Sequence, residues 1–167
     1  MESFVVRPAV GMHQMVAVPY IVALGICDAL PQAGIAWPHN VVDASTGNTL
    51  FNIETRGGYD EHGMFVRVRL ACPDGEPNEN TVQVLHKAIE ERVDAWSASA
   101  GQAPLGAVLG DYANMLVQLG KDVSVVYPSG REYARGTFAG VDIWGRATVR
   151  MDNGKQIVFP PEKYRMR

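Results

Sequence analysis

Two apolar patterns open the chain, a short β-branched run and then a long stretch that is apolar on nearly every side. Residues 3–10 predict a strand, and residues 12–30 predict a helix that is buried on most faces. Pro19 lies within this helix, where it introduces a kink or marks the true first turn. The stretch is long enough to span a membrane, but its continuous apolar part covers only residues 15–27. We therefore expect a core helix, with no membrane span and no signal peptide.

The middle of the chain alternates between apolar runs and turn-forming clusters. Residues 35–42 and 49–55 predict strands with a polar turn between them. A Gly-Gly pair within residues 56–63 predicts a polar loop. Within residues 64–71, Phe65, Arg67 and Arg69 alternate with Val66, Val68 and Leu70. This alternation is typical of a strand with one buried face. The strands on either side of the glycine loop therefore predict a hairpin.

Helical spacing returns after this hairpin. Asn80 is the predicted N-cap of a helix with an apolar stripe that reaches Trp96. A small-residue linker over residues 97–104 leads to a second helix, whose apolar positions recur through residues 105–119. Gly120 follows at the position of a left-handed C-terminal cap, so the helix is expected to end there.

From Lys121 onward the periodicity changes to that of strands. Four strand-like runs are joined by glycine turns, of which Asn153-Gly154 is the strongest hairpin signal. This set of short strands predicts a small SH3-like β-barrel. The formal charge divides at the same point, with −7 over residues 1–120 and +4 over residues 121–167. The predicted fold class is α/β (α+β), with a domain boundary near Gly120.

Composition narrows the class of protein. The chain has 167 residues, of which 47% are hydrophobic and 20% charged, so it can bury a core and is not disordered as a whole. Its net charge of −3 excludes a uniformly basic nucleic-acid binder. The two cysteines, Cys27 and Cys72, form no disulfide framework and fit reduced thiols, so we expect a cytoplasmic protein.

Three stretches resemble the biotin protein ligases, within the wider biotin/lipoate ligase superfamily. The first is a strand and long apolar helix followed by Ile35-Ala36-Trp37-Pro38-His39-Asn40, where the family has Lys-Trp-Pro-Asn-Asp. The second is Thr49-Leu50-Phe51-Asn52-Ile53, where the family reads Lys-Leu-Ala-Gly-Ile. The third starts with Tyr112 and Leu116, continues from Leu119 to Arg146, and is similar to the family's small C-terminal barrel. The resemblance implies a ligase-like layer of mixed sheet and helices over residues 1–120 and an SH3-like barrel over residues 121–167.

The departures from the family concern the residues that carry its chemistry. A ligase of this family activates biotin with ATP to biotinyl-adenylate and then transfers biotin to a carrier lysine. Both reactants are anionic, so the reaction needs cations held at the reacting oxygens. This sequence has Ala36 and Thr49 at the family's two lysine positions, and His39 and Asn40 replace its Asn-Asp pair. The family's Gly-Ile-Asn segment is replaced near residues 70–72. The resemblance therefore implies a pseudoenzyme that has lost ligase activity.

The family also carries a Gly-Arg-Gly-Arg loop upstream of the first strand seen here, and this sequence begins at that strand. The resemblance thus predicts a sheet edge and an apolar face that another chain covers. A homo-oligomer would cover them, and so would a separate partner chain that supplies the missing half. Such a partner would restore the loop but neither of the two lysines.

The best candidate for a ligand pocket is Trp37-Pro38-His39-Asn40, together with Thr49. Trp37 can wall an apolar pocket and His39 can hydrogen-bond a ligand. The alternative is that Trp37 belongs to the core while His39 and Asn40 form a turn. Biotin or ATP would be the ligand if ligase-like binding is retained. No His or Cys spacing matches a metal site, so we assign no metal ligand and no catalytic residue.

Three functions remain open. The first is a non-catalytic ligase-like protein that binds a small ligand or a protein partner, as an oligomer. The second is a biotin or lipoate protein ligase that is active only with a second chain. The third is an interaction module whose barrel binds protein or nucleic acid. The barrel's modest charge is better explained by a solvated strand face, so we do not expect nucleic-acid binding.

Overall fold

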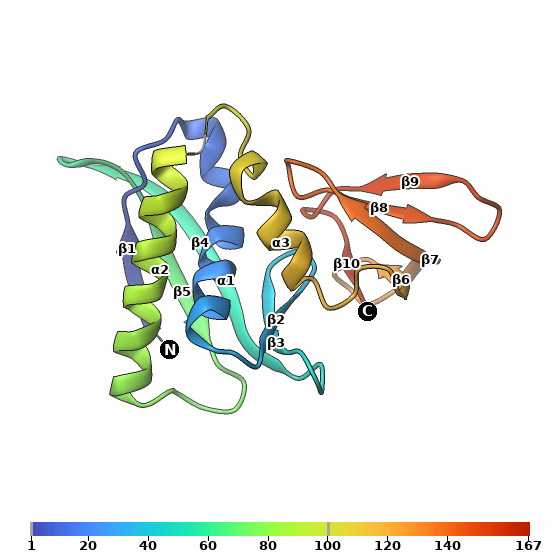
Figure 1. Cartoon of the computed structure of the whole chain (residues 1–167), viewed down its shortest axis with the longest axis horizontal. Helices are drawn as coiled ribbons and strands as arrows, with labels where there is room; N and C mark the ends of the chain where they lie inside the picture. Colours follow the sequence, from blue (N-terminus) through green and yellow to red (C-terminus); the bar gives the residue numbers. More distant parts are fainter. Residues whose placement is uncertain (1, 100) are drawn as a thin grey trace.

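The computed structural model describes residues 2–99 and 101–167. The described residues form two five-stranded antiparallel sheets and three α-helices. The N-terminal sheet has the strand order β1-β5-β4-β3-β2, and the C-terminal sheet has the order β10-β6-β7-β8-β9 (Figure 1). This arrangement confirms the expected α/β (α+β) class.

The N-terminal sheet contains β1 (Glu2–Val6), β2 (Ala33–Ala36), β3 (Asn40–Asp43), β4 (Thr49–Asp60) and β5 (Gly63–Ala71). The helices are α1 (Val18–Ala29), α2 (Glu79–Ser99) and α3 (Leu109–Met115). The C-terminal sheet contains β6 (Asp122–Val126), β7 (Glu132–Val141), β8 (Ala147–Arg150), β9 (Gln156–Phe159) and β10 (Arg165–Met166). The described ladders leave β9 and β10 unpaired with each other, so closure into a barrel stays a prediction.

The long apolar stretch near the N-terminus is a core helix. Met12–Ala17 forms a 3₁₀ helix, and Pro19 lies in the first turn of α1, where its missing N–H costs no hydrogen bond. The segment Met12–Ala29 is long and apolar enough to cross a membrane, but 67% of it is buried inside the structure. Of the two expectations for Pro19, the first turn is confirmed and the kink is wrong.

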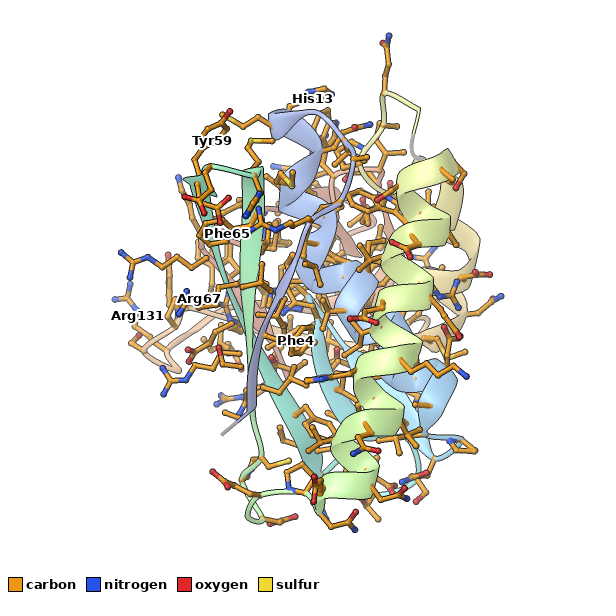
Figure 2. The ribbon with its side chains drawn as sticks, turned by 90° about the vertical axis from the view of Figure 1, so that its left-hand side faces the viewer. Phe4, His13, Tyr59, Phe65, Arg67 and Arg131 are labelled. Atoms are coloured by element: carbon orange, nitrogen blue, oxygen red, sulfur yellow. The ribbon has the colours of Figure 1, made fainter. Side chains whose placement is uncertain are left out.

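Helices α1 and α2 lie side by side over one face of the N-terminal sheet (Figure 1). Their close approach depends on Gly25, because a Cβ atom there would lie 2.7 Å from the Cα atom of Ile89. Figure 2 shows both helices on the same side of β4 and β5, and Phe4 between the sheet and α2. The other face of these strands carries no helix within residues 2–99 and 101–167.

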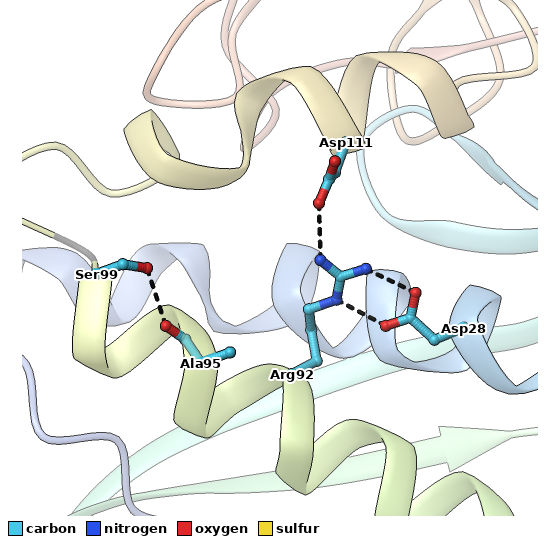
Figure 3. A network of polar contacts seen from close by, with 5 residues as sticks. All are labelled: Asp28, Arg92, Ala95, Ser99 and Asp111. Carbon is cyan, nitrogen blue, oxygen red and sulfur yellow. Dashed lines mark hydrogen bonds and ion pairs between the residues drawn. The ribbon is translucent and has the colours of Figure 1, made fainter.

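One arginine connects the three helices (Figure 3). Arg92 of α2 donates to both carboxylate oxygens of Asp28 in α1, at 2.6 and 2.7 Å, and to Asp111 of α3 at 2.8 Å. The hydrogen bonds that Arg92 donates to Asp28 and Asp111 raise the pKa of its guanidinium despite its partial burial. A bidentate guanidinium–carboxylate pair fixes geometry as well as charge, so the contact with Asp28 holds α2 against α1. The single bond to Asp111 links α3 to this pair.

The two sheets share one hydrophobic core, and backbone hydrogen bonds tie the segments around α3 to the chain on either side. Val117 donates to the Ile35 carbonyl at 2.9 Å, and Leu105 donates to the Ile143 carbonyl at 3.0 Å. Gly120 has a φ of 78°, but it does not cap the helix, because α3 ends at Met115 and its C-cap is Leu116. The expected helix cap at Gly120 is therefore wrong, and this glycine belongs to the turn that precedes β6. The boundary predicted there stays a prediction, because the core continues across it.

Four further local predictions are wrong. Residues 56–63 are not a loop, because β4 continues through Gly57 and Gly58 to Asp60, and neither glycine has a positive φ. Residues 35–42 form two strands, with a turn at residues 37–39. The cap of α2 is Asn78 and not Asn80, since the Asn78 side chain accepts from the Thr81 N–H at 2.9 Å. The expected helix over residues 105–119 is reduced to a 3₁₀ turn (Gly106–Val108) and α3.

Candidate functional site

Trp37 lies in the core, at the junction of the two sheets. It is 2% exposed, and its indole Nε1 donates to the carbonyl oxygen of Gly145 at 2.9 Å. Its backbone N–H donates to the side chain of Gln118, also at 2.9 Å. Both N–H groups of Trp37 therefore donate within the fold. This position matches the alternative in which Trp37 belongs to the core.

Pro38 and His39 lie at the same junction. The Trp37–Pro38 peptide is cis, and the Pro38 carbonyl accepts from the Tyr112 hydroxyl at 2.6 Å. The His39 ring packs edge-on against Tyr20, with centroids 5.4 Å apart. Burial, with a contribution from the charge of Arg165, lowers the pKa of His39 to about 4. The imidazole is therefore neutral at pH 7.

Asn40 and Thr49 lie at the starts of β3 and β4, where both are partly exposed. Thr49 pairs with Val42, so it lies near the far end of β3 from the turn that holds Trp37. The structure thus brings Trp37, Pro38, His39 and Asn40 together and leaves Thr49 apart. None of the five lines any of the three hollows around the β4–β5 hairpin.

The helix-free side of β1, β5 and β4 presents a second candidate, which we call the open face. Its side chains alternate with the buried Val66, Val68 and Leu70 of β5. The strand register arranges them in rows, in which directly opposed residues point to the same side. One row holds Val5, Arg67 and Arg56, the next holds Ser3, Arg69 and Glu54, and Phe65 lies opposite Gly58. Figure 2 shows Phe65 and Arg67 on the side of the sheet away from α2.

Two ion pairs flank the central row of the open face. Arg7 donates to both carboxylate oxygens of Asp60, at 3.0 and 2.5 Å, and thereby lowers the pKa of Asp60. Arg69 lies 3.5 Å from the carboxylate of Glu54, its cross-strand neighbour. Between these pairs, Arg56 and Arg67 are both exposed and directly opposite each other. In the part of the chain that the structure describes, neither makes an ion pair.

Three hollows surround the β4–β5 hairpin. One of about 270 Å³ is lined by Arg56, Gly57, Phe65 and Arg67 on the open face. A second, of about 340 Å³, is apolar and lies beside the 3₁₀ helix, with Met12, Met15, Tyr59 and Met64 among its lining residues. A third, of about 540 Å³, adjoins Arg7 and the buried Gln14. The surface around the hairpin is therefore concave in three places, and a concave surface is what a small ligand requires.

The pattern of the sequence did not reveal this site, because the Gly-Gly pair placed Arg56 in a predicted loop. A signal was present in the length of residues 64–71, since a long, regularly alternating strand needs a hairpin partner of similar length. Glu61-His62 then becomes the two-residue turn between Asp60 and Gly63, and Arg56 falls opposite Arg67.

Metal chemistry finds no support in the described residues. Across residues 2–99 and 101–167, no three His, Cys, Asp or Glu side chains gather closely enough to hold a metal ion. Burial raises the pKa of the Cys27 thiol to about 12, so this cysteine is not a thiolate at neutral pH.

Comparison with known proteins identifies the fold. No protein-family model matches the sequence, and no curated protein is significantly similar to it. The biotin protein ligase from Aquifex aeolicus superposes with a TM-score of 0.71 at 14% identity, over 99% of this chain and 80% of that chain. The same ligase in complex with biotin and ATP gives a TM-score of 0.68 at 14% identity, over 99% of this chain and 76% of that chain.

A third solved structure is a biotin protein ligase-like protein of unknown function from a Silicibacter species. It superposes with a TM-score of 0.61 at 17% identity, over 95% of this chain and 76% of that chain. The chain therefore has a biotin protein ligase-like fold, as the sequence resemblance predicted. At this level of identity the likeness concerns the fold alone.

Proposed function

We propose that this protein binds a small ligand on the open face of its ligase-like sheet and does not form an acyl-adenylate. The observation that carries the proposal is the open face itself. It combines a ligand-sized hollow with two exposed arginines that lack a carboxylate partner among the described residues. Such a surface is suited to binding an anion.

The absence of adenylate formation is supported by what surrounds this hollow. Attack of a carboxylate on the α-phosphate of ATP, with pyrophosphate as the leaving group, needs cations aimed at the reacting oxygens. At the two positions where the resemblance implies lysines, this sequence has Ala36 and Thr49. The two carboxylates of the open face, Glu54 and Asp60, are each held by an arginine. The Trp37 indole is hydrogen-bonded within the core. The proposed role is therefore binding, with biotin, lipoate or ATP as the first ligands to test.

We expect one of biotin, lipoate, octanoate or ATP to raise the melting temperature. We also expect that adding biotin, lipoate or octanoate causes no exchange of pyrophosphate into ATP. A ligand at about one hundred times its dissociation constant adds about 2.7 kcal/mol, which raises the melting temperature by a few degrees. A known biotin ligase assayed in parallel is the control for exchange. Exchange by this chain would show that it is an enzyme, and no shift with any ligand would reject binding by the chain alone.

We further propose that two copies of the chain associate through the free edge of β4. Over residues 52–60 this strand pairs with β5 on one side, and its ladder with β3 includes only Thr49 and Phe51. A long unpaired edge offers backbone N–H and C=O groups to another strand. Gly57 lies on this edge, and a Cβ atom there would meet nothing within 4 Å.

Sedimentation equilibrium is expected to show a dimer for the natural chain and a monomer for Gly57→Lys, because a charge on an edge strand disfavours pairing. Gly110→Lys is the matched control, since Gly110 of α3 also has open space around it and lies away from the sheet edge. A monomeric natural chain, or a Gly57→Lys variant that remains dimeric, would contradict this mode of association.

A further inference from the structure

We infer that Arg56 and Arg67 together form a binding site for the phosphate group of a small phosphate ester. The inference rests on the proposed function, because it places the ligand on the same open face, and it names the chemical group that the ligand carries. We call these two residues the arginine pair.

The arginine pair occupies opposed positions in the sheet. Arg56 of β4 and Arg67 of β5 are direct partners in the ladder, so their side chains leave the same face side by side. Like charges that are directly opposite on neighbouring strands destabilise a sheet. Both guanidinium groups are exposed, and they line one hollow of about 270 Å³. An anion held between them would turn this repulsion into attraction.

The charges around the arginine pair are already matched. On β4, the open face carries two acidic side chains, Glu54 and Asp60, and each has an arginine partner. Asp60 is held by both oxygens, which leaves little of its charge available to the arginine pair. The flanking rows are therefore electrically balanced, and the positive charge at the centre of the face is left for a ligand.

Two guanidinium groups together offer more N–H donors than a carboxylate can accept, so they discriminate between anions by the number of anion oxygens. Each guanidinium presents a fork of parallel N–H donors, which matches two oxygens of a carboxylate or a phosphate. A carboxylate has two oxygens and one charge, so it satisfies one fork. A phosphate monoester has three free oxygens and a charge of about −1.5 to −2 at pH 7, so it can satisfy two forks at once. Two opposed arginines therefore favour a phosphate ester over a carboxylate.

Phe65 forms the wall of the hollow. Its ring lies against Gly58, where an added Cβ atom would collide with it, and the Arg7 guanidinium lies 5.4 Å from the ring centroid. Phe65 is thus held in place and gives the hollow one rigid apolar side. A volume of about 270 Å³ is below the 300–1,000 Å³ typical of drug-sized ligands. The site therefore suits a phosphate with a small organic group.

The test compares phenyl phosphate with benzoate by isothermal titration calorimetry, because the two ligands share a ring and differ in the anion. The variants are Arg56→Met and Arg67→Met, and the matched control is Arg150→Met, an exposed arginine in β8 of the other sheet. We expect phenyl phosphate to bind more tightly than benzoate, and each arginine-pair variant to weaken its binding about tenfold or more. Arg150→Met should bind it like the natural chain.

The melting temperature of the variants supplies a second readout. Removing one member of a like-charged pair should leave the melting temperature unchanged or raise it, so weaker binding is not the result of unfolding. The inference is overturned if Arg56→Met and Arg67→Met bind phenyl phosphate normally, if Arg150→Met loses as much affinity, or if benzoate binds equally well. A single-stranded oligonucleotide that outcompetes phenyl phosphate at the same arginines would also overturn it, in favour of a nucleic-acid phosphate.

The outcomes separate this inference from the proposed function. If phenyl phosphate does not bind while biotin, lipoate or octanoate still raises the melting temperature, the phosphate site is rejected and the proposed function stands. If neither set of ligands has an effect, both are rejected. If phenyl phosphate binds through the arginine pair, the inference is supported whatever the result with biotin.

Discussion

Replacement of Trp37 by alanine is expected to lower the free energy of unfolding by about 3–5 kcal/mol, the range for removing a large aromatic side chain from a core. Trp37 is 2% exposed and lies between the two sheets, with its indole bonded to the carbonyl of Gly145. Removal of the ring leaves a cavity, and it leaves the Gly145 carbonyl without this donor. Both losses fall on the junction that holds the C-terminal sheet against the rest of the chain.

Urea unfolding followed by circular dichroism would measure the loss. Trp144→Ala is the matched control, because Trp144 is 43% exposed and lies in a turn next to Gly145. A smaller change, Trp37→Phe, keeps most of the ring volume and removes the hydrogen bond, so it should cost about 1–3 kcal/mol. Equal and small effects of Trp37→Ala and Trp144→Ala would show that the indole does not stabilise this junction.

The hydrophobic periodicity is sufficient to predict the fold class, because the buried faces of the elements repeat along the sequence. The alternation of Val66, Val68 and Leu70 with Phe65, Arg67 and Arg69 is enough to define β5 and its two faces. The apolar stretch around α1 indicates a core helix for the same reason. These signals depend only on residues close together in the chain, so they can be recognised in a single sequence.

The candidate site could not be predicted in the same way, because it depends on which strands are neighbours. Arg56 and Arg67 gain their significance only from being opposite each other, and a misplaced loop moved Arg56 out of the strand. The glycines beside Arg56 suggested a turn, although both adopt extended conformations in β4. Trp37 shows the same dependence on distant neighbours, since its hydrogen-bond partner Gly145 is 108 positions away.

Gly25 is a second position whose role only the three-dimensional contact shows, and its replacement is expected to be as costly as that of Trp37. A Cβ atom at Gly25 would lie 2.7 Å from the Cα of Ile89 and 3.2 Å from the carbonyl oxygen of Ala88. Both are backbone atoms of α2, which cannot move aside as a flexible side chain would. A substitution must therefore separate α1 from α2, the two helices that cover the sheet.

We expect Gly25→Val to destabilise the protein by about 3 kcal/mol or more, at the upper end of the range for overpacked cores, and Gly25→Ala by about 1–3 kcal/mol. Helix propensity alone predicts the opposite sign, since replacing a helical glycine by alanine is favourable by about 0.5–1 kcal/mol. Gly110→Ala tests that contribution separately, because a Cβ atom there meets nothing within 4 Å in α3. Thermal unfolding should therefore show Gly110→Ala at or above the natural chain and both Gly25 variants below it. If Gly25→Ala were as stable as Gly110→Ala, the close contact between α1 and α2 would not be a constraint on this fold.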